Sequence, residues 1–423
     1  MPSIISKTPK AIFNTVESIK QQPALPNAKL YPIFAKKDYQ CARGFLLAYK
    51  NNGATFKTYR SEIERFLQWS WLIRYKSILK HRREDVETFI AFCQKPLKSW
   101  IGFNQVFRFI IKDGQEQPNP KWRPFVVNLS KSSTKKGEKL DKGNKNKKDN
   151  KDNKDNFVLS ESAVRIIFAA LSSFYNFLIQ EESITANPVN LIKQKSKFIR
   201  KKASSSPIRR LSQDQWSYLI KAAQEMAIKK PTKHNRTLFI VQALYGMYLR
   251  ISELAASERW IPRMNSFYKD ADGNWWFKVV GKGNKERDVS VSNDMLEAFK
   301  QYRCSLNLSP LPLSTENNPL IPKFIGKGGI SDTRHIRKVV QECFDRAYQL
   351  MLKDNKKSDA AELKIATVHW LRHTGISDDV KIRPREHVRD DAGHSSGAIT
   401  DKYIDIEKRA RSLSAKKKKL VST

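Results

Sequence analysis

The stretch from Lys131 to Asn156 cannot join any hydrophobic core. Nearly all of it is Lys, Asp, Asn, Gly and Ser, and no apolar side chain stands between Leu140 and Phe157. Such a segment cannot bury enough apolar surface to offset the entropy that is lost on folding. We therefore expect a disordered, solvated insertion at 131–156, with the folded parts built from the sequence on either side of it.

A second break follows the turn signal Asn187-Pro188, where the sequence KQKSKFIRKKASSSPIRR is basic, rich in Ser and without periodicity. This composition is typical of a linker between domains, and it ends near Pro207. The 423 residues of the chain are enough for two or three domains. Residues 1–37 are rich in Pro and Lys, with only a weak helical pattern around 11–19, and we treat them as an N-terminal extension of open structure. The rest of the chain is expected to form a helical domain at 38–200 that carries the insertion, a second domain at 208–412 and a basic C-terminal tail at 413–423.

The first domain shows helical periodicity. In TFKTYRSEIERFLQWSWLI, the residues Tyr59, Ile63 and Phe66 recur at helical spacing with charged residues between them. Residues 84–93 form a second amphipathic run, with acidic residues in its first turn, where the helix dipole favours them. A third, longer helical run begins after Ser160 and ends before the turn signal. We expect a helical domain.

The second domain is expected to be mixed. It begins with the amphipathic run LSQDQWSYLIKAAQEM, in which Ser212 is placed to cap a helix. A later segment has two runs of strand character, WWFKVV and RDVSVS, and an earlier short strand around 265–268 turns back at Asp272-Gly273. We expect a multidomain, mainly α protein, in which an α+β second domain contains a small antiparallel sheet of two or three strands.

The charge balance indicates a polyanionic partner. The chain has 79 Lys and Arg against 42 Asp and Glu, a formal net charge of +37, and each cation set against a phosphate releases a condensed counterion. The insertion, with ten Lys and five acidic residues, carries only a small part of this charge. An acidic membrane surface is the alternative, but it requires a basic amphipathic helix or a lipidation signal, and neither is evident.

The cysteines and the apolar runs predict a cytoplasmic protein. The four cysteines are far apart and form no CxxC pair, which fits neither a zinc site nor a disulfide framework. The N-terminus lacks an apolar signal region, and no apolar run approaches the length of a membrane span. The sequence also contains no Walker loop and no acidic cluster typical of Mg²⁺ nucleases. We therefore expect no metal and no cofactor.

Four separated segments contain side chains that are suited to phosphate chemistry: ALYGMYLRISELA, VVGKGNKERDVSV, HWLRHT and AGHSSGAITDKYI. The candidate site residues in them are Arg250, Lys282, His369, Arg372, His394 and Tyr403. Singly, each has an ordinary explanation, such as an ion pair between Arg250 and Glu253 or a lysine in a hairpin turn. The spacing of His369 and His373 is that of a zinc-protease helix, but Trp370 stands where such a protease has its general base.

Taken together and in this order, the segments resemble the tyrosine recombinases, a family also called phage integrases. That family has an R-x-S-E-L helix, a lysine in a β-turn, an H-x-L-R-H motif, a G-H-S motif and a T-x-x-Y nucleophile. The corresponding residues here are Arg250–Leu254, Gly281-Lys282-Gly283, His369–His373, Gly393-His394-Ser395 and Thr400–Tyr403. The step of nine residues from His394 to Tyr403 is also usual for the family. The resemblance covers about 209–412 and extends more loosely to the helices around Tyr59 and Phe174.

The resemblance implies a fold and a set of partners. The N-terminal domain is expected to be a helical, SAM-like core-binding domain, and the second domain the catalytic domain of a C-shaped clamp around double-stranded DNA. In the family, recombination runs in a homotetramer on DNA, in which C-terminal segments dock onto neighbours, and accessory DNA-bending proteins are a further expected partner. The implied function is site-specific recombination that integrates or excises a mobile genetic element in the nucleoid.

Phosphodiester chemistry accounts for these residue types. Two guanidiniums can grip the non-bridging oxygens of an anionic phosphate, and we assign Arg250 and Arg372 to this clamp. Tyr403 supplies the nucleophile, and its phenol, with an ordinary pKa of about 10, needs a base or a strongly positive field. By resemblance, His369 is the base, His394 donates a hydrogen bond to the phosphate, and Lys282 protonates the leaving 5′-oxygen. The 3′-phosphotyrosyl intermediate is itself a phosphodiester, so resealing requires neither ATP nor metal.

Some local features differ from the family's usual pattern. The stretch GISDDVKIRPREHVRDDA is far more charged than the apolar helices usual there, and Ala392 stands where Leu is common. The interval between Arg250 and Lys282 is longer than usual, which leaves Lys278 and Lys285 as alternative acids.

Two other functions are weighed against recombination. A type IB topoisomerase uses the same tyrosine chemistry, but its nucleophile usually follows a Ser-Lys pair, whereas Tyr403 follows Gly-His-Ser and Thr400. A DNA-binding regulator would keep the fold and lose catalysis, and the presence of all six candidate residues argues against it.

Overall fold

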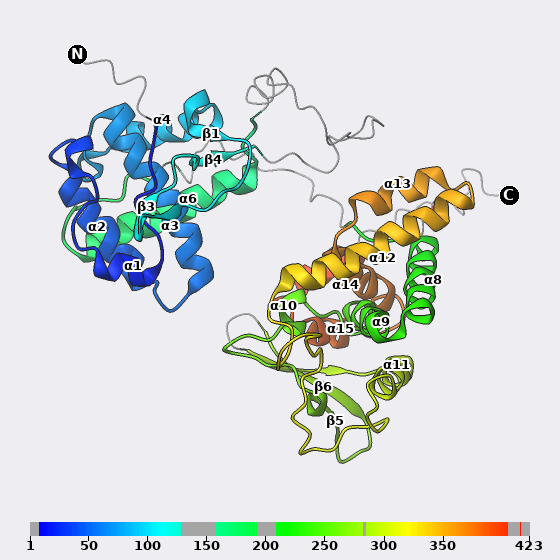
Figure 1. Ribbon diagram of the computed structural model, residues 1–423. Helices are drawn as coiled ribbons and strands as arrows, with labels where there is room; N and C mark the ends of the chain where they lie inside the picture. The colour runs from blue at the N-terminus through cyan, green and yellow to red at the C-terminus, as the bar shows by residue number, and fades with distance from the viewer. Residues whose placement is uncertain are drawn as a thin grey trace, which may run out of the picture. The chain divides into compact units, whose positions relative to one another are not determined.

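The computed structural model describes residues 8–127, 157–190, 192, 209–281, 285–404 and 415. The chain divides into two compact units, Met1–Ala203 and Ser204–Thr423 (Figure 1). The insertion predicted at 131–156 lies outside the described residues, as do most of the predicted linker and nearly all of the tail predicted at 413–423. Helices predominate in both units, which confirms the predicted mainly α class.

The N-terminal unit is built mainly from helices. They are α1 (Val16–Gln21), α2 (Ala35–Ala48), α3 (Gly53–Trp69), α4 (Arg83–Gln94) and α6 (Glu161–Gln180), with short 3-10 or π turns at Ala28–Leu30, Ser70–Arg74, Ile78–Lys80 and Lys98–Trp100. The three helical runs predicted from the sequence correspond to α3, α4 and α6. Their apolar faces meet in one core, whose largest fully buried side chains include Trp69, Trp71 and Trp100.

The long helix α6 belongs to this core. Ser160 caps it by accepting a hydrogen bond from the Ala163 backbone N–H. With 20 residues, α6 is long and apolar enough to cross a membrane by length and composition alone, so the expectation that no apolar run approaches that length was wrong. Its side chains instead pack inside the unit, where Phe168, Leu171 and Phe174 are fully buried. Burial in a protein core therefore accounts for the hydropathy of α6.

The described part of the segment 1–37 packs into the same core. Phe13 is fully buried, and the backbone N–H of Ile12 donates to the buried carboxylate of Glu64 on α3 at 2.8 Å. Arg108 forms an ion pair with the same carboxylate. Several of the contacts that hold this segment are made by its backbone. A backbone contact restricts the residue type very little, and this explains why the sequence did not indicate the packing.

Four short strands of this unit were not predicted: β1 (Ile101–Gly102), β2 (Phe109–Lys112), β3 (Gln115–Pro118) and β4 (Phe125–Val126). β2 and β3 form an antiparallel hairpin, and β1 pairs with β4 in parallel. The hairpin turns at Asp113-Gly114, where the two φ angles are 52° and 72°. Asp-Gly is a favoured pair for such a turn, so a local signal for the hairpin does exist in the sequence.

The C-terminal unit combines helices with one small sheet. Its helices are α8 (Gln213–Lys229), α9 (Pro231–Gly246), α10 (Ile251–Leu254), α11 (Asn293–Cys304), α12 (Thr333–Lys353), α13 (Lys357–Ile365), α14 (Val368–Asp379), α15 (Arg385–Ala392) and α16 (Gly397–Ile404), with a 3-10 turn at Met264–Ser266. Ser212 caps α8 as predicted, by accepting from the Gln215 N–H. Helices α8, α9, α12 and α14 pack around a large apolar core (Figure 1).

The sheet has the order β5-β6-β7 and is antiparallel throughout. Its strands are β5 (Phe267–Lys269), β6 (Trp275–Val280) and β7 (Glu286–Ser290). This confirms the predicted small sheet, including its first strand and the turn at Gly273, where φ is 90°. Phe277 of β6 lies opposite Phe267 and Val289 on the two neighbouring strands, and all three are buried. One face of the sheet therefore belongs to the core of the unit.

Helices α9 and α14 pack backbone against backbone at Gly375. A Cβ atom built on Gly375 lies 2.1 Å from the carbonyl oxygen of Tyr245 and 3.1 Å from the ring of Tyr248. No side chain larger than hydrogen fits there unless one helix moves. Arg250 follows the end of α9 and Arg372 lies on α14, so this contact helps to set the separation between two predicted site residues.

We expect Gly375→Ala to destabilise the C-terminal unit by about 3 kcal/mol, because the added methyl group forces two packed helices apart. Scanning calorimetry of the full chain would show this as a lowered unfolding transition. Gly53→Ala is the matched control, because a Cβ atom at Gly53 meets nothing within 4 Å, and it should change stability by no more than about 0.5 kcal/mol. Identical transitions for the two variants would contradict the close approach of the helices.

The charged stretch 375–392 is held by a network of polar contacts. Arg383 donates to Asp391 at 2.7 Å, and to the hydroxyls of Ser290 and Tyr248 at 2.9 Å each. The buried Asp391 also accepts from the Ser290 backbone N–H at 3.0 Å. These bonds join the connection between α14 and α15 to β7 and to the end of α9. The stretch can carry many charges because its partly buried polar groups satisfy one another.

Candidate active site

Five of the six predicted site residues line one open pocket in the C-terminal unit. The pocket has a volume of about 860 Å³, and these five residues are Arg250, His369, Arg372, His394 and Tyr403. They come from the end of α9, from α14, from the turn after α15 and from α16, which are far apart in the sequence. The sixth predicted residue, Lys282, lies outside the described residues.

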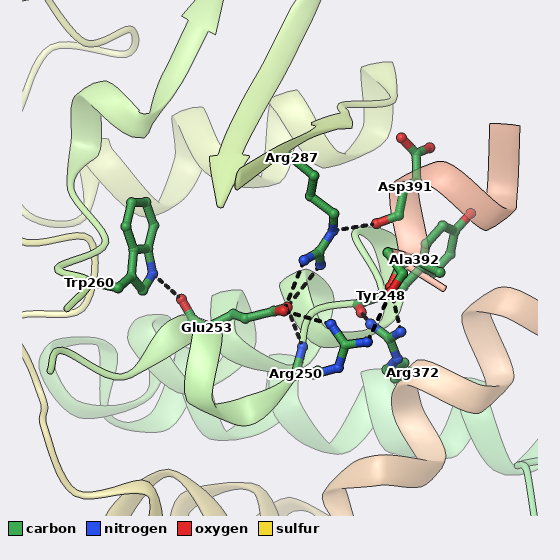
Figure 2. A network of polar contacts seen from close by, with 9 residues as sticks. Tyr248, Arg250, Glu253, Trp260, Arg287, Arg372, Asp391 and Ala392 are labelled. Atoms are coloured by element: carbon green, nitrogen blue, oxygen red, sulfur yellow. Dashed lines mark hydrogen bonds and ion pairs between the residues drawn. The ribbon is translucent and has the colours of Figure 1, made fainter. Parts of the chain in front are cut away.

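Arg250 is held by the buried carboxylate of Glu253 (Figure 2). Its Nη1 donates to Glu253 Oε1 at 2.9 Å, and its backbone N–H donates to Oε2 at 2.8 Å. Arg287 of β7 donates through both Nη atoms to the same carboxylate, each at 2.9 Å. The ion pair considered as the ordinary explanation of Arg250 is therefore present, and it leaves 33% of the Arg250 side chain exposed.

Two opposing effects act on Glu253. Burial raises its pKa, but the hydrogen bonds and the charge of Arg287, with a smaller contribution from Arg250, hold the pKa below its usual value. Glu253 is therefore ionised at neutral pH and keeps both guanidiniums in fixed orientations.

Arg372 is buried beneath the pocket, with 3% of its surface exposed. Its Nη1 donates to the carbonyl oxygen of Tyr248, and its Nη2 donates to that of Ala392 at 2.6 Å (Figure 2). Burial, together with repulsion from Arg250, lowers the pKa of Arg372 to about 10, so it stays cationic at neutral pH. A guanidinium has five N–H donors, so these two bonds orient it and leave others for a phosphate oxygen.

His394 follows a glycine with left-handed backbone. Gly393 has a φ of 60°, and a Cβ atom there would lie 3.0 Å from Cδ of Arg287, so only glycine suits the position. His394 Nδ1 lies 2.8 Å from Thr400 Oγ1, and its ring stacks on that of Tyr403 with centroids 5.8 Å apart. Burial lowers the pKa of His394 to about 4, so its ring is neutral in the free protein.

The hydroxyl of Tyr403 lies against His373. Tyr403 is 5% exposed, and its Oη is 2.6 Å from His373 Nδ1. Burial raises the pKa of Tyr403, while the charges of Arg372 and Arg250 oppose the rise. Burial, together with His369 and Arg372, lowers the pKa of His373 to about 3. In the free protein a neutral phenol therefore shares a hydrogen bond with a neutral imidazole.

His369 lies one turn before His373 on the same face of α14. The two rings meet edge to face, with centroids 4.2 Å apart and an interplanar angle of 71°. His369 is the more exposed of the two, and desolvation together with the charge of Arg372 lowers its pKa. His369 therefore faces incoming ligands, while His373 faces the phenol.

The lysines considered as the acid are placed differently. Lys285 lines the pocket, whereas Lys278 lies on β6 opposite Asp288 of β7. Gly281 and Lys285, which precede and follow the undescribed residues 282–284, both line the pocket. The chain therefore enters and leaves the predicted lysine turn at the site, which keeps Lys282 and Lys285 as candidates.

Among the pocket residues that were not predicted as site residues, Arg287 and His373 make polar contacts with the site: Arg287 with Glu253, and His373 with Tyr403. Arg287 lies on the predicted strand RDVSVS, and a charged side chain on a short strand usually indicates a solvent-exposed face. His373 belongs to the H-x-L-R-H motif, but the sequence analysis gives it no catalytic role and weighs it only against a zinc site. Its position four residues after His369, on the same helix face, is the signal that could have identified it.

We expect the C-terminal unit to lose stability in mild acid, because the pKa values of His373 and His394 are lowered in the folded protein. The pKa values of His373 and His394 in the folded protein, about 3 and about 4, lie below the unfolded value of about 6.5. The unfolded chain therefore binds more protons as the pH falls from 6.5 towards 4, and stability falls by up to about 1 kcal/mol per histidine and pH unit. Calorimetry between pH 6.5 and 5 tests this.

A matched pair of variants assigns the effect. His394→Asn should flatten the pH dependence, whereas His335→Asn, at an exposed position on α12, should leave it unchanged. A stability that does not change between pH 6.5 and 5 would contradict the burial of these rings.

Comparison with known proteins identifies the relatives of the chain. No protein-family model matches it. The tyrosine recombinase XerC of Chlorobaculum parvum is 24% identical over 248 residues, which cover 56% of this chain and 67% of that protein. The tyrosine recombinase XerC of Pediococcus pentosaceus is 24% identical over 255 residues, which cover 59% of this chain and 73% of that protein.

The fold is also found among solved structures. The XerH site-specific recombinase, bound to its palindromic difH substrate in a post-cleavage complex, matches with a TM-score of 0.51 at 12% identity, over 90% of this chain and 85% of that chain. The chain is thus similar in sequence to tyrosine recombinases and shares the fold of one of them, in agreement with its motifs.

Proposed function

We propose that the chain is a site-specific DNA recombinase, an integrase, that cleaves and rejoins DNA strands through a covalent bond between Tyr403 and a 3′-phosphate. The observation that carries this proposal is the convergence of the Tyr403 hydroxyl with Arg250 and Arg372 in one open pocket. A nucleophile and two guanidiniums at one site suit attack on a phosphodiester. The biological outcome is the integration or excision of a mobile genetic element.

The substrate is double-stranded DNA. The net charge of +37 favours a polyanion, and the pocket itself contains Arg250, Arg287, Arg372 and Lys285. Arg287 uses both Nη atoms on Glu253 and its Nε on the carbonyl oxygen of Asp391, so Arg250, Arg372 and Lys285 are the pocket cations with donors left for a phosphate. In this proposal the two guanidiniums hold the non-bridging oxygens and stabilise the charge that builds on them during attack.

The reaction exchanges one phosphodiester for another. The oxygen of Tyr403 attacks the phosphorus, and the bond to the 5′-oxygen breaks. Lys282, on the turn that begins and ends at the pocket, protonates that oxygen, and His394 donates a hydrogen bond to the phosphate. By resemblance, His369 of α14 is the base that takes the phenolic proton. Because the bond energy is conserved in the phosphotyrosyl link, a second 5′-hydroxyl can reseal the strand without ATP, metal or cofactor.

The number of strand cleavages in recombination determines the expected oligomeric state. Exchange between two duplexes needs four cleavages, so we propose a homotetramer on DNA with one Tyr403 from each subunit. The protein works in the cytoplasm on nucleoid DNA, and accessory DNA-bending proteins can bring distant sites together.

The test uses the purified full chain and labelled duplexes from both ends of the genetic element that carries its gene. Each duplex is nicked near the presumed crossover, so that religation fails and the covalent product accumulates. We expect a band that is retarded on a denaturing gel and is restored to free DNA by protease. Tight binding on a native gel without such a band would favour a DNA-binding regulator instead, and relaxation of supercoiled plasmid without strand exchange would favour a topoisomerase.

A further inference from the structure

The hydrogen bond between His373 and Tyr403 joins the nucleophile to a histidine that none of the predicted roles uses. The two atoms, His373 Nδ1 and Tyr403 Oη, are 2.6 Å apart, which is the distance of a strong hydrogen bond. A general base must lie within this reach of the proton that it removes. By resemblance the base is His369, but among the contacts of the described residues, the phenol is bonded to His373.

The position of His373 follows from that of the phosphate clamp. It is the residue after Arg372 on α14, and the close packing of α14 on α9 at Gly375 holds this part of the helix. On the other side, the ring of Tyr403 lies in a small apolar cluster that includes Tyr248 and Ile376. The phenol and the imidazole are thus each fixed by packing, and the hydrogen bond between them does not depend on a mobile side chain.

The environment of His373 keeps its imidazole ring uncharged in the free protein, so that the ring can accept a proton. The titratable and charged groups around it are His369 and Arg372 on its own helix, His394 from the turn after α15, and Tyr403 from α16. These cationic or neutral neighbours and burial keep the free imidazole uncharged. A neutral imidazole with its proton on Nε2 has its Nδ1 lone pair free, so the phenol O–H donates to it.

We propose that His373, rather than His369, is the general base that removes the proton of Tyr403 during DNA cleavage; this rests on the recombinase function proposed above. The O–H bond of Tyr403 breaks, and its proton passes to His373 Nδ1. The phenolic oxygen forms the bond to phosphorus, and the electron pair of the breaking P–O bond remains on the 5′-oxygen, which takes its proton from the lysine acid. In resealing, His373 returns the proton to Tyr403.

The arrival of DNA is what makes this transfer favourable. In the free protein the imidazolium would stand beside Arg372 without an anion to offset it, so Tyr403 keeps its proton. The phosphate brings negative charge between Arg250 and Arg372, and this charge stabilises a proton on His373. His369, more exposed and in edge contact with the ring of His373, is then left to contact a phosphate oxygen.

The first experiment compares His373→Asn with His369→Asn in single-turnover cleavage of the nicked duplexes. The Oδ1 atom of Asn can replace Nδ1 as a hydrogen-bond acceptor but cannot be protonated near neutral pH. We expect His373→Asn to slow cleavage by about 100-fold or more, and His369→Asn to show the smaller loss of a phosphate contact. A raised pH should speed His373→Asn more than the parent, because hydroxide then removes the phenolic proton. A merely structural loss would not respond in this way.

The second experiment separates a base from an acid. A duplex with sulfur in place of the bridging 5′-oxygen releases a thiolate, which needs no proton. The loss in Lys282→Ala should be restored by this duplex, and the loss in His373→Asn should remain. Restoration of His373→Asn by sulfur would make His373 an acid and overturn the proposal, as would a cleavage rate within about threefold of the parent.

A third variant guards against misfolding. His373→Ala leaves a space at the phenol that added imidazole can enter, and we expect imidazole to restore part of the cleavage rate. Failure of imidazole to restore this variant, when its unfolding transition matches that of the parent, would contradict the proposal. If the parent chain itself forms no covalent band, the recombinase function fails, and if it does while His373→Asn cleaves normally, this inference alone fails.

Discussion

Tyr403→Phe is expected to abolish the covalent DNA complex while leaving DNA binding intact. The substitution removes one oxygen atom, and the ring keeps its stacking on His394 and its place in the small cluster with Tyr248 and Val388. The loss of the hydrogen bond to His373 should lower the free energy of unfolding by about 1 kcal/mol. Without the oxygen no phosphotyrosyl bond can form, so the protease-sensitive band should fall below detection.

Tyr348→Phe is the control for this result. Tyr348 lies on α12, where its ring is 6.0 Å from the ammonium of Lys364, and it takes no part in the pocket. This variant should cleave at the rate of the parent. A covalent band that survives in Tyr403→Phe would place the nucleophile elsewhere and would refute the mechanism. Loss of native-gel binding in Tyr403→Phe would instead assign the residue to DNA affinity.

Arg372→Lys should be the second most damaging change, although it keeps the charge. Arg372 uses its planar fork to bond two carbonyl oxygens and still has donors for a phosphate. A lysine has three donors at a single nitrogen and cannot meet both carbonyls and the substrate. We expect cleavage to slow by about 100- to 1,000-fold, as when a fixed donor to a developing oxyanion is removed. DNA affinity and its salt dependence should change little, because both depend on charge.

Single-turnover rates on the nicked duplexes measure this effect. Arg346→Lys is the matched control, because Arg346 on α12 pairs with Glu225 of α8 at 2.8 Å and lies outside the pocket. A cleavage rate within about threefold of the parent for Arg372→Lys would show that a single positive charge suffices. The planar guanidinium group would then have no catalytic role. A rate loss matched by an equal loss in affinity would assign Arg372 to binding alone.

Local sequence patterns predicted the elements whose contacts are themselves local. The strand character of WWFKVV and RDVSVS and the turn at Gly273 reflect the pairing of adjacent strands, and the apolar period after Ser160 reflects one face of α6. The segment 1–37 left no comparable pattern. Several of its contacts join backbone atoms to side chains on other elements, such as the Ile12 N–H on Glu64, and a backbone donor is the same for every residue type except proline.

The site was predictable in its residue types and order but not in its contacts. The motifs identified the arginines, the histidines and the tyrosine, because phosphate chemistry restricts which side chains serve. Which of two histidines on one helix face meets Tyr403 depends on how α16 docks on α14, and no local rule decides this. The same holds for Arg287, which meets Glu253 across 34 positions of sequence. Such long-range contacts form only when the strands and helices are assembled.

The contact of α9 with α14 at Gly375 has a practical consequence for anyone who wishes to redirect the enzyme. Because main-chain atoms of the two helices meet there directly, the distance between Arg250 and Arg372 depends little on the side chains that surround the contact. Libraries that diversify exposed positions on these helices other than His369, in search of a new target sequence, should therefore yield many variants that still cleave. Randomisation that includes Gly375 should yield few, whatever its effect on recognition. The recognition of the DNA target can thus be changed by directed evolution without loss of cleavage, provided that Gly375 and the pocket residues are kept constant.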